Sequence, residues 1–394
     1  MWQKIKNYYH LAQAFLWATF FGFPSRKLKI IGVTGTDGKT TTVNMVYHIL
    51  KSAGKKVSMV SSVNAVIGEK TYETGFHVST PSPFDVQKYL KKALNSGSEY
   101  FVLETTSHGL DQNRLAFVDF EVGLLTNITH EHLDYHKTRE NYVQAKLKLL
   151  KNSQKTILNK DDESFGYIQN KLSGNITTYS QKADSDFNLK NTPISLNVPG
   201  NYNLSNALAA VAATTSVGID KIQAQKALKF FPGVKGRMEE IKTRQDFNIY
   251  VDFAHTPNGL KNALSTLRVK KGRGRLIAVF GAAGQRDKSK RPFMGEIADN
   301  LADIIILTSE DPRKENPKSI CEQIKKGIVK KKFKKTLFVI VDRQEAINYA
   351  VKIAKPKDTI AVFGKGHETS MNIGGKEQHW SDFEAAEKAL GKTK

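Results

Sequence analysis

The sequence has almost none of the chemistry that cysteine supplies, because its 394 residues include one cysteine, Cys321. One thiol forms no disulfide framework and no thiolate metal cluster, so both are excluded. Acidic side chains are also scarce, with 38 Asp and Glu against 60 Lys and Arg, which gives a formal net charge of +22. The length and the ordinary share of apolar residues, 40%, predict a globular protein of two or three domains in a reducing compartment, the cytoplasm.

The basic residues are spread over the whole chain and form no nucleic-acid-binding motif. Their densest run, KKGIVKKKFKK (325–335), is interpreted as a helix face that leads into a strand. A solvated surface is the simplest explanation of such a run, and an anionic membrane or substrate is the alternative. We therefore expect polyanionic partners, such as ATP and a nucleotide-sugar, and no nucleic acid.

The apolar run LAQAFLWATFFGF (11–23) is too short to cross a membrane, because a spanning helix needs roughly 20 residues. It follows two lysines, as the core of a signal peptide would. Gln13 interrupts it, however, and no small-residue cleavage site follows. We expect residues 1–26 to form an amphipathic helix that packs on the core or lies on the inner face of the membrane.

Short β-rich runs alternate with helical stretches, which predicts an α/β fold with a mostly parallel sheet. KLKIIGV (27–33) is predicted to be a strand, and a helical pattern extends from Lys39 to about Ala53. YFVLETT (100–106) and VGLLTNI (122–128) are further buried strands that end in polar residues. Ligands bind at the carboxyl ends of such strands, so we expect the functional site there.

A break rich in glycine and proline, FPGVKG (231–236), is the predicted domain boundary. A second α/β unit is predicted after it, from strands that alternate with helical stretches. These predicted strands are IYVDFA (249–254), LIAVFGAA (276–283), DIIILTS (303–309), TLFVIV (336–341) and TIAVFG (359–364). The expected organisation is therefore a segment 1–26, a central domain 27–233 and a C-terminal domain 234–394.

The segment VTGTDGKTTT (33–42) predicts a phosphate-binding loop between a strand and a helix. Backbone N–H groups of a glycine-rich turn and of the following helix start can hold phosphates. Lys39 would neutralise the β- and γ-phosphates, and the Thr40 hydroxyl would bind Mg²⁺. Val33 stands where the common P-loop spacing has glycine, so a simple glycine turn is the alternative. The residues predicted to bind ATP here are Gly35, Thr36, Asp37, Gly38, Lys39, Thr40 and Thr41.

Two other segments are dense in polar residues, LETTSHGLDQNR (103–114) and TNITHEHLDYH (126–136). Glu104 ends a predicted buried strand, where a carboxylate would suit Mg²⁺, although a structural carboxylate is the more ordinary explanation. The histidines and acids of the second segment suggest metal or phosphate chemistry, with a polar loop as the alternative.

These motifs, in this order, resemble the Mur ligase family, and HLDYH (132–136) resembles its branch that adds the third amino acid to the peptidoglycan stem peptide. The resemblance runs from about residue 27 to about residue 390. It implies a P-loop-type central domain, a Rossmann-like α/β C-terminal domain, and an ATP- and Mg²⁺-dependent ligase that works through an acyl phosphate. The family usually has asparagine in place of Asp37. Residues 1–26 stand where it has a uridine-nucleotide domain.

The resemblance also implies roles for residues of the central domain. Glu104, His132 and Thr40 would hold Mg²⁺. Lys146, otherwise an ordinary solvated lysine, would be carbamylated by CO₂ and become a carboxylate-like ligand beside the metal. Asn206 would contact adenine. The residues expected to contact the muramoyl dipeptide are Ser79, Thr80, Ser107, His108 and Arg114, although a simple proline turn explains the first two equally well.

In the C-terminal domain, the resemblance implies that Arg237 reaches the γ-phosphate when the domains close. Asp252 and His255 would line the nucleotide. Closure would exclude water that could hydrolyse an acyl phosphate. The predicted catalytic residues are therefore Lys39, Lys146 and Arg237.

The segment TSEDPRKE (308–315) is similar to the DNPR motif of the diaminopimelate-adding ligases. Arg313 would pair with the distal carboxylate of diaminopimelate, which lysine lacks. This chain has Glu-Asp where the motif has Asp-Asn, which adds a negative charge. The residues expected to bind the added amino acid are Glu310, Asp311, Arg313, Gly364 and Glu368.

Two alternatives remain. A related ligase such as folylpolyglutamate synthase also lacks a uridine-binding domain, but HLDYH, the DPR motif and GKGHE (364–368) argue against it. The second alternative is a non-catalytic partner protein that binds a nucleotide. Such a protein would not require Lys39, Glu104, His132 and Lys146, so their presence argues against it. The expected partners are a UDP-muramoyl dipeptide or a related acceptor and a diamino acid, and the expected state is a monomer.

Overall fold

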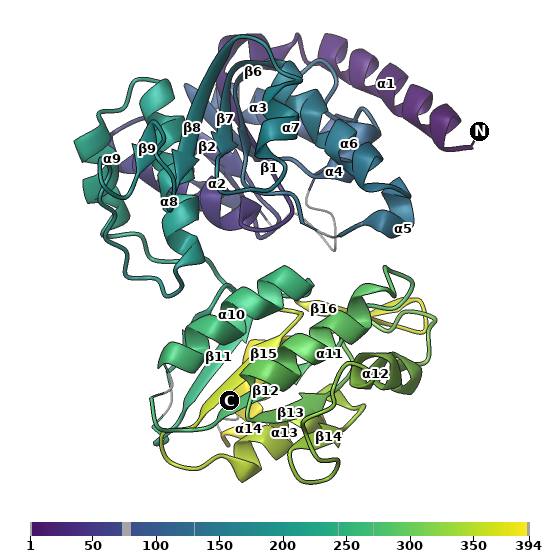
Figure 1. Ribbon diagram of the computed structural model, residues 1–394. Helices are drawn as coiled ribbons and strands as arrows, with labels where there is room; N and C mark the ends of the chain where they lie inside the picture. Colours follow the sequence, from purple (N-terminus) through teal and green to yellow (C-terminus); the bar gives the residue numbers. More distant parts are fainter. Residues whose placement is uncertain (1, 73–79, 130, 243, 271, 392–394) are drawn as a thin grey trace. The chain divides into compact units, whose positions relative to one another are not determined.

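The chain folds into two α/β units, Met1–Pro232 and Gly233–Lys394, each around its own sheet (Figure 1). The structure, a computed structural model, describes residues 2–72, 80–129, 131–242, 244–270 and 272–391.

The first unit is built on a nine-stranded sheet with the order β4-β3-β2-β5-β1-β6-β7-β8-β9. The β2–β3 and β3–β4 pairs are antiparallel, and the other neighbouring pairs are parallel. The strands are β1 (Lys29–Thr34), β2 (Val57–Val60), β3 (Ala65–Ile67), β4 (Lys70–Tyr72), β5 (Tyr100–Glu104), β6 (Phe120–Leu125), β7 (Ser153–Asn159), β8 (Asn175–Ser180) and β9 (Phe187–Asn188). The central strands are buried on both faces, as expected for a parallel sheet.

Helices cover both faces of this sheet. One face carries Ile30, Phe101 and Leu103, which pack with apolar residues of α3, α4 and α6. Strand residues alternate between the faces, so Ile31 and Val33 point to the other side, where α2 and α8 contact the sheet and each other. The helices are α1 (Trp2–Phe20), the 3₁₀ helix η1 (Pro24–Lys27), α2 (Lys39–Ser52), α3 (Pro83–Asn95), α4 (Ser107–Asp111), α5 (Leu133–His136), α6 (Arg139–Lys151), α7 (Phe165–Gln169), α8 (Tyr202–Ser216) and α9 (Lys221–Leu228).

The second unit has a six-stranded sheet with the order β10-β11-β15-β12-β13-β14, in which only the β10–β11 pair is antiparallel among the described residues. A separate hairpin is formed by β16 (Ser370–Ile373) and β17 (Lys376–His379). The sheet strands are β10 (Glu239–Ile241), β11 (Asn248–Asp252), β12 (Leu276–Phe280), β13 (Ile304–Leu307), β14 (Leu337–Val339) and β15 (Thr359–Phe363). The helices are α10 (Pro257–Lys270), α11 (Lys290–Leu301), α12 (Pro317–Lys325), α13 (Arg343–Ile353) and α14 (Asp382–Ala389).

The predicted fold class is confirmed: both units are α/β, and both sheets are mostly parallel. Two local predictions were wrong. The first strand begins at Lys29, because Pro24–Lys27 form η1. The basic run 325–335 is not a helix face, because α12 ends at Lys325 and the run continues through turns. Gly327 passes so close to α11 that a Cβ there would lie 1.9 Å from Pro292 O, a packing that only glycine permits.

Among the described residues, no helix combines the length and the hydropathy that crossing a bilayer requires.

Candidate functional site

The candidate site of the first unit lies where four neighbouring strands end. β2, β5, β1 and β6 are adjacent and parallel, so their carboxyl ends meet at one edge of the sheet. Polar residues follow at each end: Ser62 after β2, Glu104 at the end of β5, the phosphate loop after β1 and Thr126 after β6. This is the place where open parallel sheets bind ligands.

The phosphate loop has two positions that accept only glycine. Gly38 has a φ of 82°, and a Cβ there would lie 2.4 Å from Asn206 Oδ1. At Gly35, a Cβ would lie 1.8 Å from Thr126 Oγ1. The loop is therefore clamped between α8 and the end of β6, and α2 begins directly after it at Lys39.

Residues after β6 fix the conformation of this loop. Asn127 Oδ1 accepts a hydrogen bond from the Asp37 backbone N–H at 2.9 Å, and Asn127 Nδ2 donates to Asp37 O at 3.1 Å. Thr126 Oγ1 also donates to Asp37 O, at 2.7 Å. The loop carbonyls thus point into the protein. A glycine-rich turn followed by a helix start is an arrangement whose backbone N–H groups can bind an anion.

Lys39, Thr40 and Glu104 are held close to the loop. Lys39 Nζ donates to Thr36 O at 2.7 Å, and Thr40 Oγ1 donates to Glu104 Oε2 at 3.0 Å. The Ser62 hydroxyl is hydrogen-bonded to that of Thr40 at 2.8 Å, and the Ser62 N–H donates to Glu104 Oε2 at 2.9 Å. Thr40 and Glu104 are both buried. A buried hydroxyl beside a buried carboxylate is an oxygen donor set that fits Mg²⁺.

The described residues contain no group of three or more His, Cys, Asp or Glu side chains placed to hold a metal ion on their own. Mg²⁺ is typically held by one or two carboxylates together with substrate phosphates. The Thr40–Glu104 pair beside a phosphate loop is compatible with that mode of binding.

Lys146 of α6 is fully buried under the phosphate loop. Its Nζ donates to Gly35 O at 2.6 Å and lies 4.5 Å from the centre of the Tyr142 ring. The Tyr142 hydroxyl is in turn hydrogen-bonded to that of Thr36 at 3.0 Å. Burial, and secondarily the positive charge of Lys39, hold the pKa of Lys146 well below its usual value. The amine is therefore neutral over a wider pH range than an exposed lysine, and the neutral amine is the form that adds CO₂.

A cluster of histidine and tyrosine side chains lies beside the loop. The His108 ring is 4.8 Å from that of His132 and 4.2 Å from that of Tyr135, between ring centres. His136 Nε2 and Ser107 Oγ are hydrogen-bonded at 3.0 Å. Burial lowers the pKa of His136 to about 4, so this ring is neutral near pH 7. The predicted Mg²⁺ role of His132 stays a prediction.

Two of the predicted substrate residues are linked to each other and to β5. Arg114 Nη1 donates to Thr80 O at 3.1 Å, and the hydroxyls of Thr80 and Thr106 are hydrogen-bonded at 2.9 Å. Ser79 lies outside the described residues. The sheet edge therefore brings Thr80 and Arg114 to the same strand end as Glu104.

The sequence predictions of site residues do not include four residues that lie at this edge: Ser62, Thr126, Asn127 and Tyr142. Ser62, Thr126 and Asn127 are polar residues within two positions of a strand end, and this position is the signal that could have identified them. Tyr142 carries no such signal, because it lies inside a helix and reaches Thr36 of the loop only in the folded structure.

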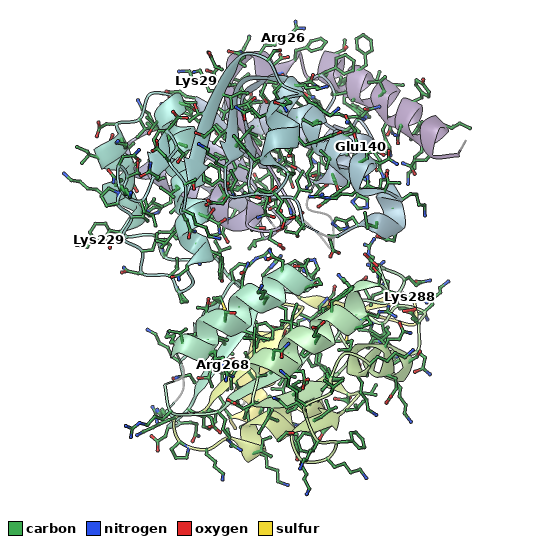
Figure 2. The ribbon with its side chains drawn as sticks, in the orientation of Figure 1. Arg26, Lys29, Glu140, Lys229, Arg268 and Lys288 are labelled. Atoms are coloured by element: carbon green, nitrogen blue, oxygen red, sulfur yellow. The ribbon has the colours of Figure 1, made fainter. Side chains whose placement is uncertain are left out.

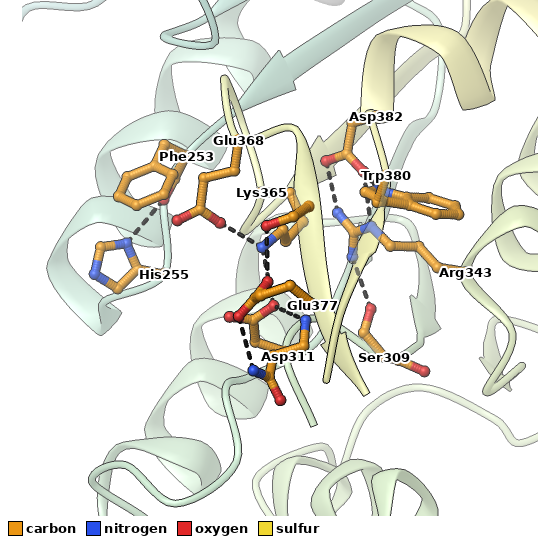
Figure 3. A network of polar contacts seen from close by, with 12 residues as sticks. Phe253, His255, Ser309, Asp311, Arg343, Lys365, Glu368, Glu377, Trp380 and Asp382 are labelled. Carbon is orange, nitrogen blue, oxygen red and sulfur yellow. Dashed lines mark hydrogen bonds and ion pairs between the residues drawn. The ribbon is translucent and has the colours of Figure 1, made fainter. Parts of the chain in front are cut away.

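The second unit contains a buried polar cluster around Lys365 (Figure 3). Lys365 Nζ pairs with Asp311 Oδ1 at 2.9 Å and forms a second ion pair with Glu368. The Asn372 N–H also donates to Asp311 Oδ1, at 3.0 Å. A Cβ at Gly364 would lie 2.6 Å from Glu310 Oε2. Four of the five residues predicted to bind the added amino acid therefore lie around one buried lysine, which the sequence predictions did not include.

Arg313, the fifth, lies in the loop beside this cluster. Its backbone N–H donates to Asn372 O at 2.9 Å, and it forms a bridge with Ile373 of the β16–β17 hairpin. Its φ of 53° is unusual for a residue other than glycine. The hairpin thus fixes the backbone from which the Arg313 side chain extends.

Arg237, Asp252 and His255 lie together at the end of β11. Asp252 accepts hydrogen bonds from the backbone N–H groups of Met238 at 2.7 Å and Ala254 at 2.8 Å. The Arg237 guanidinium lies 4.5 Å from the centre of the Phe253 ring, and the His255 ring lies 4.6 Å from it. Figure 3 shows His255 turned back to the Phe253 carbonyl.

Replacing Glu310 with glutamine should flatten the pH dependence of stability. Glu310 Oε2 has no hydrogen-bond partner among the described residues, and burial raises the pKa of Glu310 from 4.5 to about 7. Between pH 4.5 and about 7, the Glu310 carboxyl stays protonated in the folded protein, whereas it releases its proton in the unfolded chain. The stabilisation is therefore complete below pH 4.5 and is lost as the pH rises through 7. The difference between the folded and unfolded pKa values of Glu310 corresponds to a loss of roughly 3 kcal/mol in the free energy of unfolding.

The measurement is the free energy of unfolding by denaturant at pH 5 and pH 8. Glu310→Gln should lose less stability than the parent protein between these values. Glu345→Gln, at an exposed position on α13, is the matched control and should follow the parent. Equal losses in all three proteins would contradict the prediction.

Comparison with known proteins gives a consistent result. The Mur ligase middle domain family matches residues 33–214, and the Mur ligase glutamate ligase domain family matches residues 236–366. A UDP-N-acetylmuramoyl-L-alanyl-D-glutamate–2,6-diaminopimelate ligase of Clostridium botulinum is 38% identical over 96% of this chain and 81% of its own length. A ligase of this kind from Clostridium acetobutylicum is 40% identical over 95% of this chain and 80% of its own length. Another, from Aquifex aeolicus, is 38% identical over 94% of this chain and 79% of its own length.

Solved structures of other proteins have a fold similar to that of this chain. A UDP-N-acetylmuramoyl-L-alanyl-D-glutamate–2,6-diaminopimelate ligase structure has a TM-score of 0.61 at 29% identity and covers 92% of this chain and 78% of that chain. A Mycobacterium tuberculosis folylpolyglutamate synthase in complex with ADP has a TM-score of 0.70, with 90% and 91% covered, but at 15% identity it shows the common fold alone. The two domain matches and the identity to whole-length relatives lead to one conclusion: this chain belongs to the Mur ligase family.

Proposed function

We propose that this chain is an ATP-dependent ligase that adds meso-diaminopimelate to a muramoyl-L-Ala-D-Glu acceptor in peptidoglycan precursor synthesis. One observation carries the proposal: the phosphate loop, the Thr40–Glu104 pair and buried Lys146 meet at one sheet edge. The chain that has this edge is 38% identical to a relative named as such a ligase.

The reaction consists of two transfers. The D-glutamyl carboxylate of the acceptor attacks the γ-phosphorus of ATP, so that an acyl phosphate forms and ADP leaves. The amine of the diamino acid then attacks the acyl carbon, an amide forms, and phosphate leaves. Enzymes accelerate such steps mainly by positioning and charge neutralisation. In this chain the loop N–H groups and Lys39 would hold the phosphates, and Arg237 would neutralise charge on the transferred group.

The metal would be bound by Thr40, Glu104 and His132, with carbamylated Lys146 beside them. Mg²⁺ would supply positive charge to the phosphate oxygens. The lowered pKa of Lys146 supports its conversion to a carbamate, because CO₂ adds to a neutral amine. Such a carbamate would be a buried anion directly under the loop, where it would offset the cations that bind ATP.

The amino acid would bind at the buried cluster around Lys365 in the second unit. Glu368 and Asp311 both form ion pairs with Lys365, which would hold these carboxylates in place for an ammonium group. Arg313 would pair with the distal carboxylate of diaminopimelate. The acceptor would be a UDP-muramoyl dipeptide bound by Thr80, Ser107, His108 and Arg114, and the protein would act as a monomer.

The decisive experiment measures ADP and amide formation with purified protein, ATP, Mg²⁺ and UDP-muramoyl-L-Ala-D-Glu. meso-Diaminopimelate, L-lysine and other amines are offered one at a time. We expect turnover with diaminopimelate and at least a tenfold lower kcat/KM with lysine, since a lost bidentate contact costs roughly 1.5–3 kcal/mol. Arg313→Ala should remove this preference, while Lys314→Ala, its exposed neighbour, should keep it.

Turnover with lysine alone would assign the ligase a different diamino acid. Turnover only with a folate and glutamate would replace the proposal with a folylpolyglutamate synthase. No turnover with any acceptor, despite ATP binding, would favour a non-catalytic nucleotide-binding protein.

A further inference from the structure

Helix α1 has one side packed on the first unit and one side exposed. Ala14 and Ala18 are buried, and the Trp17 ring lies 4.8 Å from the Phe84 ring of α3, between centres. Phe15 contacts Phe117 at 5.4 Å between ring centres. These contacts fix the helix, and therefore fix which of its residues face outwards.

The outward side of α1 is also apolar. Its exposed large residues are Ile5, Tyr8, Tyr9, Leu16 and Phe20, with exposed fractions of 54%, 72%, 61%, 59% and 72%. Their spacing of three and four residues, or multiples of it, places them on one helix face. A helix on the surface of a soluble protein normally presents charged and polar residues outwards. We name these five residues the α1 apolar face.

The sequence of α1 and of the segment that follows it is basic. Residues 1–29 contain no Asp or Glu, whereas Lys6, Arg26, Lys27 and Lys29 are all exposed. Arg26 and Lys29, labelled in Figure 2, follow the helix directly in the chain. Arg26 has an acidic neighbour, Asp119, at 3.7 Å, in a pair that is exposed on both sides. The formal net charge of the whole chain is +22.

We propose that the α1 apolar face docks on an anionic phospholipid surface, with the helix lying in the plane of the interface. A helix with aromatic and aliphatic side chains on one face, no acidic residue of its own and cations close to it in the sequence has the composition of helices that bind at the headgroup level. Tyr8 and Tyr9 combine an apolar ring with a polar hydroxyl, which suits this boundary. Charge complementarity selects anionic lipid over neutral lipid.

This inference is independent of the ligase proposal, because α1 contributes no residue to the phosphate loop or to the Thr40–Glu104 pair. A protein that lacks ligase activity could still bind the lipid surface, and a ligase could fail to bind it. An experiment can therefore disprove the lipid-binding proposal without affecting the ligase proposal, and the reverse also holds.

The test is co-sedimentation of the full chain with vesicles of phosphatidylglycerol and phosphatidylethanolamine, and with vesicles of phosphatidylcholine. We expect binding to the anionic vesicles, at least tenfold weaker binding to the neutral ones, and weakening of the former at high salt. Replacing Arg26, Lys27 and Lys29 with glutamine should weaken binding about fivefold for each charge removed.

A pair of charge substitutions on the apolar face gives the sharpest comparison. Tyr8→Glu with Leu16→Glu should weaken binding to the anionic vesicles more than tenfold. Ile222→Glu is the matched control, because Ile222 of α9 is as exposed as Leu16, at 59%. It should bind within twofold of the parent protein. Ligation of soluble substrates, measured in parallel, should be equal in all of these variants, which also verifies their folding.

Absence of binding to the anionic vesicles would overturn the proposal. Equal loss in the Ile222→Glu control would also overturn it, because the effect would then follow net charge alone. Conversion of a dimer into a monomer by Leu16→Glu, without vesicle binding by the parent, would identify the face as a contact between two copies of the chain.

Discussion

Replacing Lys39 with alanine is expected to reduce ATP-dependent ligation by roughly a hundredfold or more, the range seen when one charge-stabilising group is removed from an active site. Lys39 is the first residue of α2 and lies against the loop that would hold the phosphates. Its loss removes a positive charge beside this loop, while Thr126 and Asn127 still hold the backbone of the loop through hydrogen bonds to Asp37. The measurement is ADP formation under saturating acceptor and diamino acid.

Lys51→Ala is the matched control, because Lys51 is an exposed residue in the last turn of the same helix. It should keep the parent rate. Both variants should unfold at a similar temperature, since neither lysine is fully buried. Full activity of Lys39→Ala would contradict the proposal that this loop binds the phosphates of ATP.

Replacing Lys146 with methionine is expected to lower kcat by roughly a hundredfold or more, because the buried anion that we propose at this position cannot form. Methionine has a similar length and no charge, so it fills the space without a buried cation. The folded structure should therefore persist, although the bond from Nζ to Gly35 O is lost. Lys151→Met, at the exposed end of α6, should behave as the parent protein.

Two measurements separate a carbamate from a purely structural lysine. Protein equilibrated with ¹³C-labelled bicarbonate should show a carbamate signal in ¹³C NMR that Lys146→Met lacks. Removal of CO₂ should lower the activity of the parent protein, and added bicarbonate should restore it. If activity did not respond to CO₂, Lys146 would act only as a hydrogen-bond donor to the loop.

The two predictions differ in how far the sequence alone supports them. Lys39 sits within a local pattern of strand, glycine turn and helix, and the structure has α2 begin at this residue. Lys146 is one of several lysines on a helix, and within the sequence only the family resemblance distinguishes it; its burial under the loop is a result of tertiary packing. Lys148, two residues away, instead donates to the carbonyls of Leu110 and Asp111.

The sequence by itself determined the alternation of strands and helices and the glycine turn that precedes α2. These features depend on interactions between residues that are close in the chain: hydrophobic period, glycine turns and helix starts. The basic run 325–335 shows the limit of such reasoning. The helix α12 ends at the first residue of this run, Lys325, and Gly327 then packs closely against α11, a contact between segments that the local pattern does not reveal.

Only the tertiary structure decided which polar residues share a site. Ser62, Glu104 and Thr126 belong to three different strand ends, and the order β2-β5-β1-β6 brings them around one loop. The same applies to Asp311 and Glu368, which meet at Lys365 because β13 and β15 both flank β12. The physical reason is that burial and charge pairing act through space. The pKa of a lysine and the partners of a carboxylate are therefore fixed only once distant segments pack together.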